Sequence, residues 1–161
     1  MCLPYDKAAT NGFWNTRGRK GKSWCWAYKL FLFVDGELRP AFGCLFGKKN
    51  HIVKAGYVKS DRSSKIPFKD DSDQTDCAYI NKGIHVIINS QKVAEYLSVP
   101  WNDVPIVTAR VKCLKKDFVA SSKLVTKTMH DGAGEAVFMK VFLPKSERDR
   151  ILKKFSKTKK L

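Results

Sequence analysis

The segment that most restricts the fold of this chain is WCWAYKLFLFV, residues 24–34. Its aromatic and branched side chains are typical of a β-strand. Asp35-Gly36 follows directly, and this dipeptide favours the tight type I′ turn of a β-hairpin. ELRPAFGCLF, residues 37–46, then returns as the partner strand, and Pro40 within it predicts a sheet edge or a bulge because proline lacks an N–H. We therefore expect an antiparallel sheet.

Four later segments also predict strands, because each is a short apolar or alternating run. They are residues 51–58, 83–88, 104–114 and 134–144. The alternation is clearest in 104–114, where one parity is small and apolar and the other is polar. The apolar set is Val107, Ala109, Val111 and Cys113, and the polar set is Thr108, Arg110 and Lys112.

Two short helices are expected. Asn89 or Ser90 can cap a helix that runs through Leu97, and Pro100 lies just beyond it. Ser146 can cap a last helix that continues to about Phe155. These elements predict an α+β fold, a single domain whose curved, mostly antiparallel sheet has about six strands and two short helices.

Charge and composition divide the chain into regions. Residues 1–23 are expected to form a basic, flexible N-terminal arm, 24–155 the α+β domain, and 156–161 a basic C-terminal tail. Within the domain, residues 59–78 are predicted to be a long polar loop that carries an acidic cluster. The cluster lacks the glycine and the terminal glutamate of an EF-hand, so we interpret it as a solvated acidic loop.

The chain is strongly basic. Its 161 residues include 31 Lys and Arg against 15 Asp and Glu, a net charge of +16. Such a charge favours a nucleic acid, DNA or RNA, or another phosphate-rich ligand, because neutralised phosphates release counterions. The predicted phosphate contacts are Arg17, Arg19, Lys20, Lys22, Arg110, Lys112, Lys153 and Lys154.

Aromatic side chains are candidates for stacking on bases. We single out Trp14 and Trp101. Trp24, Trp26 and Tyr28 share one parity of the first strand and form either a core face or a platform. The opposite parity is also apolar, which favours burial on both sides over a platform.

Cysteine usage predicts neither a zinc site nor a disulfide framework. The five cysteines include no C-x-x-C pair, and their number is odd. Reduced thiols in a cytoplasmic protein are the expectation, with no metal and no cofactor. The chain also has no apolar run long enough to cross a bilayer, so no membrane partner is expected.

No strong catalytic motif is present, and the sequence favours a binding protein over an enzyme. His85 lies in an apolar strand, where a histidine is either a general base in a pocket or a core residue held by a hydrogen bond. His130 precedes a glycine-rich turn, and Glu135 opens the strand that follows. His85, Glu135 and a lysine or arginine are the set that a metal-free nuclease would use.

Four segments resemble small uncharacterised domains of bacteriophage and prophage genomes. They are WAYKLFLFVDGELRP, NKGIHVIINSQKVAEYL, VPIVTARVKCLKKDFVAS and EAVFMKVFLP. The matching motifs are Tyr28, Lys29 and Phe31, then Gly83, Ile84 and His85, and the likeness spans about residues 26–144. The resemblance implies a phage origin and action in the host cytoplasm. Those domains have no agreed activity, so no catalytic residue is transferred.

Three functions follow as hypotheses, in this order. The first is a non-enzymatic nucleic-acid-binding protein that acts in host takeover or defence evasion. The second is a phage-type inhibitor that binds a host defence protein or sequesters a phosphorylated nucleotide signal. The third is a small metal-free nuclease or nucleotide-transferring enzyme.

Overall fold

The computed structural model describes residues 3–4, 6–16, 18–40, 53–59, 68–69, 78–80, 83–88, 104–122 and 134–156. Several sequence predictions lie outside these residues. They are the helix to Leu97, Arg17, Trp101, His130, most of the 59–78 loop, and the tail after Ser156.

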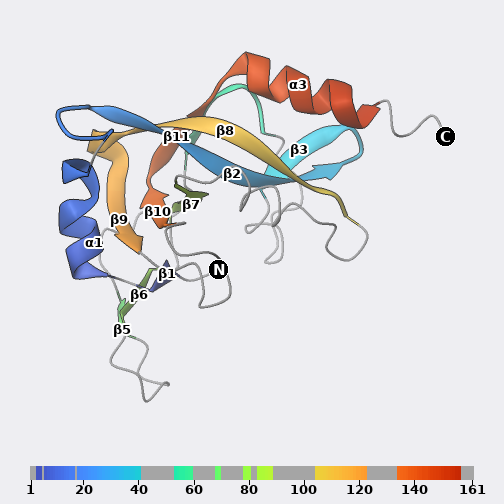
Figure 1. Cartoon of the computed structure of the whole chain (residues 1–161). Helices are drawn as coiled ribbons and strands as arrows, with labels where there is room; N and C mark the ends of the chain where they lie inside the picture. The colour runs from blue at the N-terminus through green and yellow to red at the C-terminus, as the bar shows by residue number, and fades with distance from the viewer. Residues whose placement is uncertain are drawn as a thin grey trace.

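The described residues form an α+β domain built on an antiparallel sheet, as the sequence predicts (Figure 1). Eight strands make up the main sheet, two more than expected, in the order β4-β11-β8-β2-β7-β10-β9 with β3 also on β2. Three further strands form a small second sheet, β1-β6-β5. The main strands are β2 Trp24–Val34, β3 Glu37–Pro40, β4 Gly56–Lys59, β7 Ile84–Ile87, β8 Ile106–Leu114, β9 Phe118–Ser122, β10 Glu135–Phe138 and β11 Lys140–Leu143; the small sheet holds β1 Leu3–Pro4, β5 Phe68–Lys69 and β6 Ala78–Ile80.

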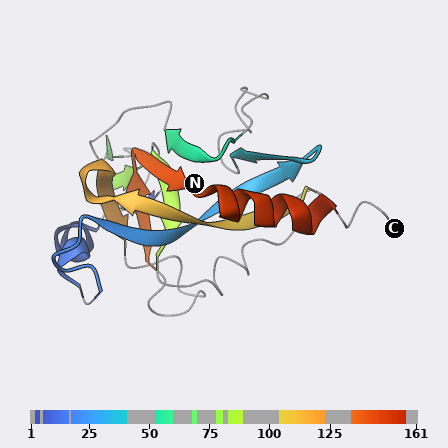
Figure 2. The same ribbon diagram turned by 90° about the horizontal axis from the view of Figure 1, so that it is seen from above.

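The centre of the sheet is the pair β2 and β8. They are paired from Trp24↔Leu114 to Leu32↔Ile106 and run side by side along the molecule (Figure 2). The predicted hairpin after β2 is confirmed, since Asp35 and Gly36 both have positive φ, 52° and 81°, as a type I′ turn requires. β3, which contains Pro40, pairs with β2 and with no other described strand, in agreement with the edge position that the missing N–H predicts.

The N-terminal region differs from the flexible arm that we expected. Asp6 accepts a hydrogen bond from the Ala9 N–H and caps α1, Lys7–Gly12, and the short 3₁₀ helix η1, Phe13–Asn15, follows. Phe13 and Trp14 are buried, and the Phe13 ring stacks on Phe118 at 4.6 Å between centroids. Burial of two large aromatic side chains orders this segment, although its sequence has no helical periodicity.

The predicted strand 134–144 is two strands, not one. Met139 separates them, and its N–H donates to the Asp117 carbonyl at the end of the 3₁₀ helix η3, Lys115–Asp117. β10 then pairs with β7 and β9, whereas β11 pairs with β8 and β4. Phe138 is consequently buried in the core, and the residues after the break belong to the other end of the sheet.

The last helix, α3, runs from Lys145 to Ser156 and matches the predicted extent, but it begins one residue before Ser146, so Ser146 lies in its first turn and is not its cap. It lies at the opposite end of the sheet from α1, as Figures 1 and 2 both show. Ile151 is buried, and the Phe155 ring packs against Phe33 with 5.2 Å between centroids. Arg148 joins the helix to β3 through an ion pair with Glu37 at 3.1 Å.

The core lies on the face of β8 that its alternation predicts. Val107, Ala109, Val111 and Cys113 are at most 2% exposed, and they pack with the same parity of β2. Cys25 and Cys113 are direct cross-strand partners and both are free, buried thiols. No helix among the described residues is long and apolar enough to cross a membrane.

Candidate functional site

Four side chains form one row across the outer face of the sheet. Trp26 on β2 is paired with Lys112 on β8, Lys112 with Phe142 on β11, and Phe142 with Tyr57 on β4. Directly paired residues project from the same face of a sheet, so all four lie on one surface. Trp26 and Tyr57 are 37% and 57% exposed, and they are the exposed large apolar side chains of the described residues.

Cations cover the aromatic rings of this surface in a repeated diagonal pattern. The Arg110 guanidinium lies 4.4 Å from the centre of the Trp26 ring, and the Lys112 ammonium lies 4.5 Å from that of Trp24. Lys140 repeats the arrangement over Tyr57 at 4.6 Å. Each cation therefore contacts a ring on the neighbouring strand. We call this surface the cationic–aromatic face: Trp24, Trp26, Tyr57, Arg110, Lys112, Lys140 and Phe142.

The cationic–aromatic face carries charge of one sign. The four strands β2, β4, β8 and β11 contain no Asp or Glu. No carboxylate on these strands offsets the field of Arg110, Lys112 and Lys140, and Glu147 on the neighbouring helix is the carboxylate that interacts with Arg110. A surface of one sign attracts polyanions, and flat aromatic rings within it can stack on planar groups.

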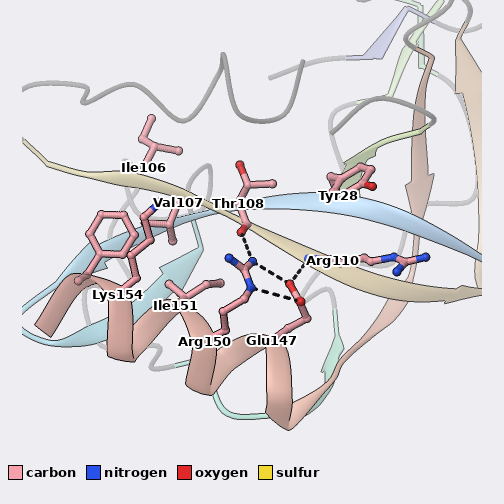
Figure 3. Close-up of a pocket in the computed structure, with 10 residues that line it drawn as sticks. Tyr28, Ile106, Val107, Thr108, Arg110, Glu147, Arg150, Ile151 and Lys154 are labelled. Carbon is pink, nitrogen blue, oxygen red and sulfur yellow. Dashed lines mark hydrogen bonds and ion pairs between the residues drawn. The ribbon is translucent and has the colours of Figure 1, made fainter. Parts of the chain in front are cut away.

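Helix α3 borders this face by capping the open edge of β8. β11 is paired with β8 at Lys112 and Cys113, and Pro144 follows the end of β11. Farther along β8, Glu147 accepts a hydrogen bond from the Arg110 N–H at 3.0 Å (Figure 3). Arg150 donates to the Thr108 carbonyl at 3.4 Å and to Glu147 at 3.0 Å. An ion pair thus satisfies backbone groups that a strand would otherwise pair with.

The pKa of Glu147 reflects this position. Burial alone raises the pKa, but hydrogen bonds from the Arg150 side chain and the Arg110 backbone outweigh burial and hold it below its usual value. Glu147 is therefore ionised over the whole neutral range.

A groove lies between α3 and β8, with a volume of about 640 Å³. Arg110, Arg150 and Lys154 line it together with the carboxylate of Glu147. Apolar side chains, among them Val107 and Ile151, form part of its wall (Figure 3). Phe155 also lines the groove. Arg110 belongs both to this groove and to the cationic–aromatic face, so the two features are continuous.

A second cluster lies in the interior, where β2, β7 and β10 meet. Lys29 on β2, His85 on β7 and Glu135 on β10 come together from distant parts of the sequence. Lys29 and Glu135 are each 6% exposed. Both ring nitrogens of His85 are buried, and neither has a hydrogen-bond partner among the described residues. The structure therefore groups His85 and Glu135 with a lysine, but in the interior.

Burial dominates the pKa values of this cluster. It lowers the pKa of Lys29 to about 8, with Glu135 acting in the opposite direction. It lowers the pKa of His85 to about 3 and raises that of Glu135 to about 7. His85 is consequently neutral at physiological pH, and Glu135 and Lys29 are the two groups of the three whose pKa values lie close to neutrality.

The other predicted contact residues have different surroundings. Arg19 is half-buried, donates to the Phe13 carbonyl at 2.7 Å and lies over the Phe13 ring, so it holds the turn after η1. Lys20, Lys22 and Lys153 are exposed, and Lys154 lines the groove. Trp14 is only 8% exposed and packs among aromatic rings, so it does not present a face for stacking as we expected.

Two members of the cationic–aromatic face, Tyr57 and Phe142, are missed by the sequence prediction, because they join it only through the pairing of β11 with β4 and β8. The sequence leaves the face of Lys140 open, because Lys140 has the same parity as Phe138 and Phe142, and the break at Met139 decides it. A signal for Tyr57 is present in the sequence: Val58, the next residue of the strand, packs against the core, so Tyr57 faces the opposite side of the sheet.

We expected both faces of β2 to be buried, and this is wrong for the face that carries Trp24, Trp26 and Tyr28. Trp26 is exposed, and Trp24 and Tyr28 are only half-buried. The reason is that α3 and the aromatic cluster around Phe13 both pack against the other parity of the sheet. The platform alternative therefore agrees with the geometry of Trp26.

Comparison with protein families, with functionally characterised proteins and with solved structures finds no match to this chain. Within the described residues, no three His, Cys, Asp or Glu side chains gather in a group that could hold a metal ion. The phage resemblance stays a prediction.

Proposed function

We propose that this protein binds nucleic acid through the cationic–aromatic face, without sequence-specific readout. The observation that carries the proposal is the row of Trp26, Lys112, Phe142 and Tyr57, flanked by Arg110 and Lys140, on strands that contain no acidic residue. Phosphate contacts fix a nucleic acid on such a surface and carry no sequence information. Action in host takeover or defence evasion remains part of the proposal through the phage resemblance.

Charge magnitude supports nucleic acid over a neutral partner. The chain has a net charge of +16, and Arg110 is exposed on the face where it contacts Trp26. Exposed lysines outside the sheet, such as Lys20 and Lys22, add attraction over a longer range. Their contribution is screened by salt sooner than contacts made directly on the face.

A salt titration with two matched variants tests the proposal. One variant is Arg110→Gln, Lys112→Gln, Lys140→Gln. The control removes the same charge from exposed lysines off the sheet: Lys7→Gln in α1, Lys116→Gln in η3 and Lys145→Gln in α3. Each lost phosphate contact lowers the slope of log affinity against log salt by roughly 0.7 for a single strand or 0.9 for a duplex.

We expect the face variant to lose about two to three units of this slope and the control to lose less than one. Affinity near physiological salt then falls at least tenfold for the face variant alone. Equal losses in the two variants would show that net charge, and not this face, attracts the nucleic acid. Binding that disappears from the unmodified protein at physiological salt would reject the function altogether.

The groove between β8 and α3 supports the nucleotide-capture alternative. Three cations, Arg110, Arg150 and Lys154, line it beside an apolar wall that includes Phe155. That combination suits a phosphorylated nucleotide, whose base is flat and whose phosphates are anionic. Saturable, salt-tolerant binding of a mononucleotide, lost in Arg150→Gln, would favour this function over the first.

A further inference from the structure

We propose that the cationic–aromatic face selects single-stranded nucleic acid, whose bases stack on Trp26 and Tyr57 when the cations that cover these rings move onto phosphates. The inference rests on the proposed function, and it names the substrate class and the step by which the surface accepts it. Two exposed rings and the cations over them carry it.

The exposed rings are placed for a shared ligand. A single exposed aromatic side chain is ordinary on a protein surface. Here Trp26 and Tyr57 are the exposed large apolar side chains of the described residues, and both belong to the same transverse row. Three strand spacings separate β2 from β4, about 14 Å across the sheet. Lys112 and Phe142 fill the positions between them.

In this proposal each cation has two positions, over its ring in the free protein and on a phosphate in the complex. In the free protein Arg110 lies over Trp26 at 4.4 Å and Lys140 over Tyr57 at 4.6 Å. An exposed cation–ring contact of this kind favours its closed form only about two- to fivefold. A base stacked on an aromatic ring is worth about five- to a hundredfold in affinity. Exchange of the cation for a base is therefore favourable, and the released cation is beside the strand's phosphates.

The need for free base faces separates a single strand from a duplex. In a duplex each base is already stacked on its neighbours and only its edge is accessible in a groove. In a single strand the bases can turn outward and stack on aromatic side chains. Every base has a flat face, so this recognition tolerates any sequence. DNA and RNA share this chemistry.

The opposing explanation is that these pairs only stabilise the sheet. Cross-strand pairs of a cation and an aromatic ring do contribute to sheet stability. In that case the rings do not contact the ligand, and removing one changes stability but not the preference for a single strand. The two explanations therefore differ in a measurable property of binding.

The experiment compares three ligands with equal numbers of phosphates near physiological salt. They are a single-stranded oligothymidine, an abasic oligomer of the same length, and a duplex. Labelled ligands are titrated with the unmodified protein, Trp26→Leu, Tyr57→Leu and Trp26→Phe. Both leucine variants keep every cation and an apolar side chain at an exposed position, and circular dichroism with thermal unfolding checks each fold. Oligouridine is run in parallel to distinguish RNA from DNA.

We expect the unmodified protein to bind the single strand at least tenfold more tightly than the abasic oligomer or the duplex. Trp26→Leu and Tyr57→Leu each lose about tenfold for the single strand and change less than twofold for the other ligands. Trp26→Phe retains most of the affinity because it keeps a ring face.

Equal affinity for all three ligands, unchanged in the leucine variants, would overturn the inference while leaving the proposed function intact. Losses of the same size for the single strand and the abasic oligomer would also overturn it, because an abasic strand has nothing to stack. No binding of any ligand by the unmodified protein would reject the proposed function and this inference together.

Discussion

Individual residues decide how closely the strands of this sheet can approach. Gly83 precedes β7 with a φ of +97°, a conformation that side chains rarely adopt. A Cβ at this position would also collide with Cγ1 of Val137 on the adjacent β10. The G-I-H motif that the sequence singles out therefore has a structural reason for its glycine.

We expect Gly83→Ala to lower the free energy of unfolding by more than ~1 kcal/mol, because backbone strain and the collision with Val137 act together. Gly36→Ala is the matched control, since Gly36 also has a positive φ, +81°, but nothing lies within 4 Å of its added Cβ. Urea denaturation of both variants measures the difference. Equal losses would show that β10 moves aside without cost.

His85 is a buried base whose protonation opposes folding. Its pKa is about 3 in the folded protein against 6.5 for a free histidine, so between these values only the unfolded chain binds the proton. Stability attributable to His85 therefore falls as pH drops below 6.5. At pH 5 the free energy of unfolding is therefore ~2 kcal/mol lower than it would be without this proton uptake.

We compare the free energy of unfolding of His85→Leu with that of the unmodified protein at two pH values. The difference in favour of His85→Leu is expected to be ~2 kcal/mol larger at pH 5 than at pH 8. Glu135 titrates in an overlapping range, but it is present in both proteins and cancels in the difference. Chemical denaturation at the two pH values gives the four free energies required. Parallel pH profiles for the two proteins would mean that His85 accepts a proton without leaving the folded state.

At the scale of elements, the most informative contact is between a helix and the edge of a strand. β8 is paired with β2 along its length, but β11 leaves its other edge after a short pairing. α3 then lies along that edge. Glu147 accepts a hydrogen bond from the Arg110 N–H, and Arg150 donates one to the Thr108 carbonyl. The helix thus protects an edge that would otherwise offer a template for aggregation.

We expect Glu147→Ala to cost ~1 kcal/mol at neutral pH, because the Arg110 N–H loses its acceptor. The pKa of Glu147 is lowered, so this stabilisation is complete above the free value of 4.5 and disappears as pH falls through the folded pKa. Thermal unfolding at pH 7 and at a series of acidic pH values therefore shows a difference that is full at pH 7 and shrinks as pH falls below 4.5. Lys153→Ala, at an exposed position of the same helix, is the control and leaves stability unchanged across the series. A cost for Glu147→Ala that stays constant across the acidic series would contradict the role of the carboxylate.

At the scale of the whole molecule, charge and fold oppose each other. A net charge of +16 repels itself when the chain is compact, and exposed lysines such as Lys20, Lys22 and Lys153 contribute to that repulsion. Salt shortens the range of this repulsion from about 10 Å at 0.1 M to about 3 Å at 1 M. The same charge that attracts a polyanion thus lowers stability at low salt.

We therefore expect the thermal unfolding midpoint to rise as sodium chloride increases from about 0.02 to about 0.5 M. Lys20→Gln, Lys22→Gln, Lys153→Gln removes three of these charges and makes the rise smaller. Differential scanning calorimetry of both proteins measures the effect. A midpoint that falls with salt would show that local ion pairs, such as Arg148 with Glu37, outweigh the general repulsion.

Much of the sheet is determined locally, and the sequence predicts it for that reason. The Asp35-Gly36 turn, the alternation of β8 and the last helix α3 each depend on neighbouring residues, and the structure confirms all three. The outward position of Arg110 and Lys112 follows from the same alternation. The net charge, and with it the attraction for polyanions, is a property of composition alone.

Tertiary structure alone decided which of these elements meet. The break at Met139 sends β10 and β11 to different ends of the sheet, and this places Lys140 beside Tyr57. Phe13 and Trp14 are held in the core because Phe118 and Phe138 come from strands more than a hundred residues away. Strand pairing and core packing join residues that are distant in the chain, so no local pattern specifies the cationic–aromatic face.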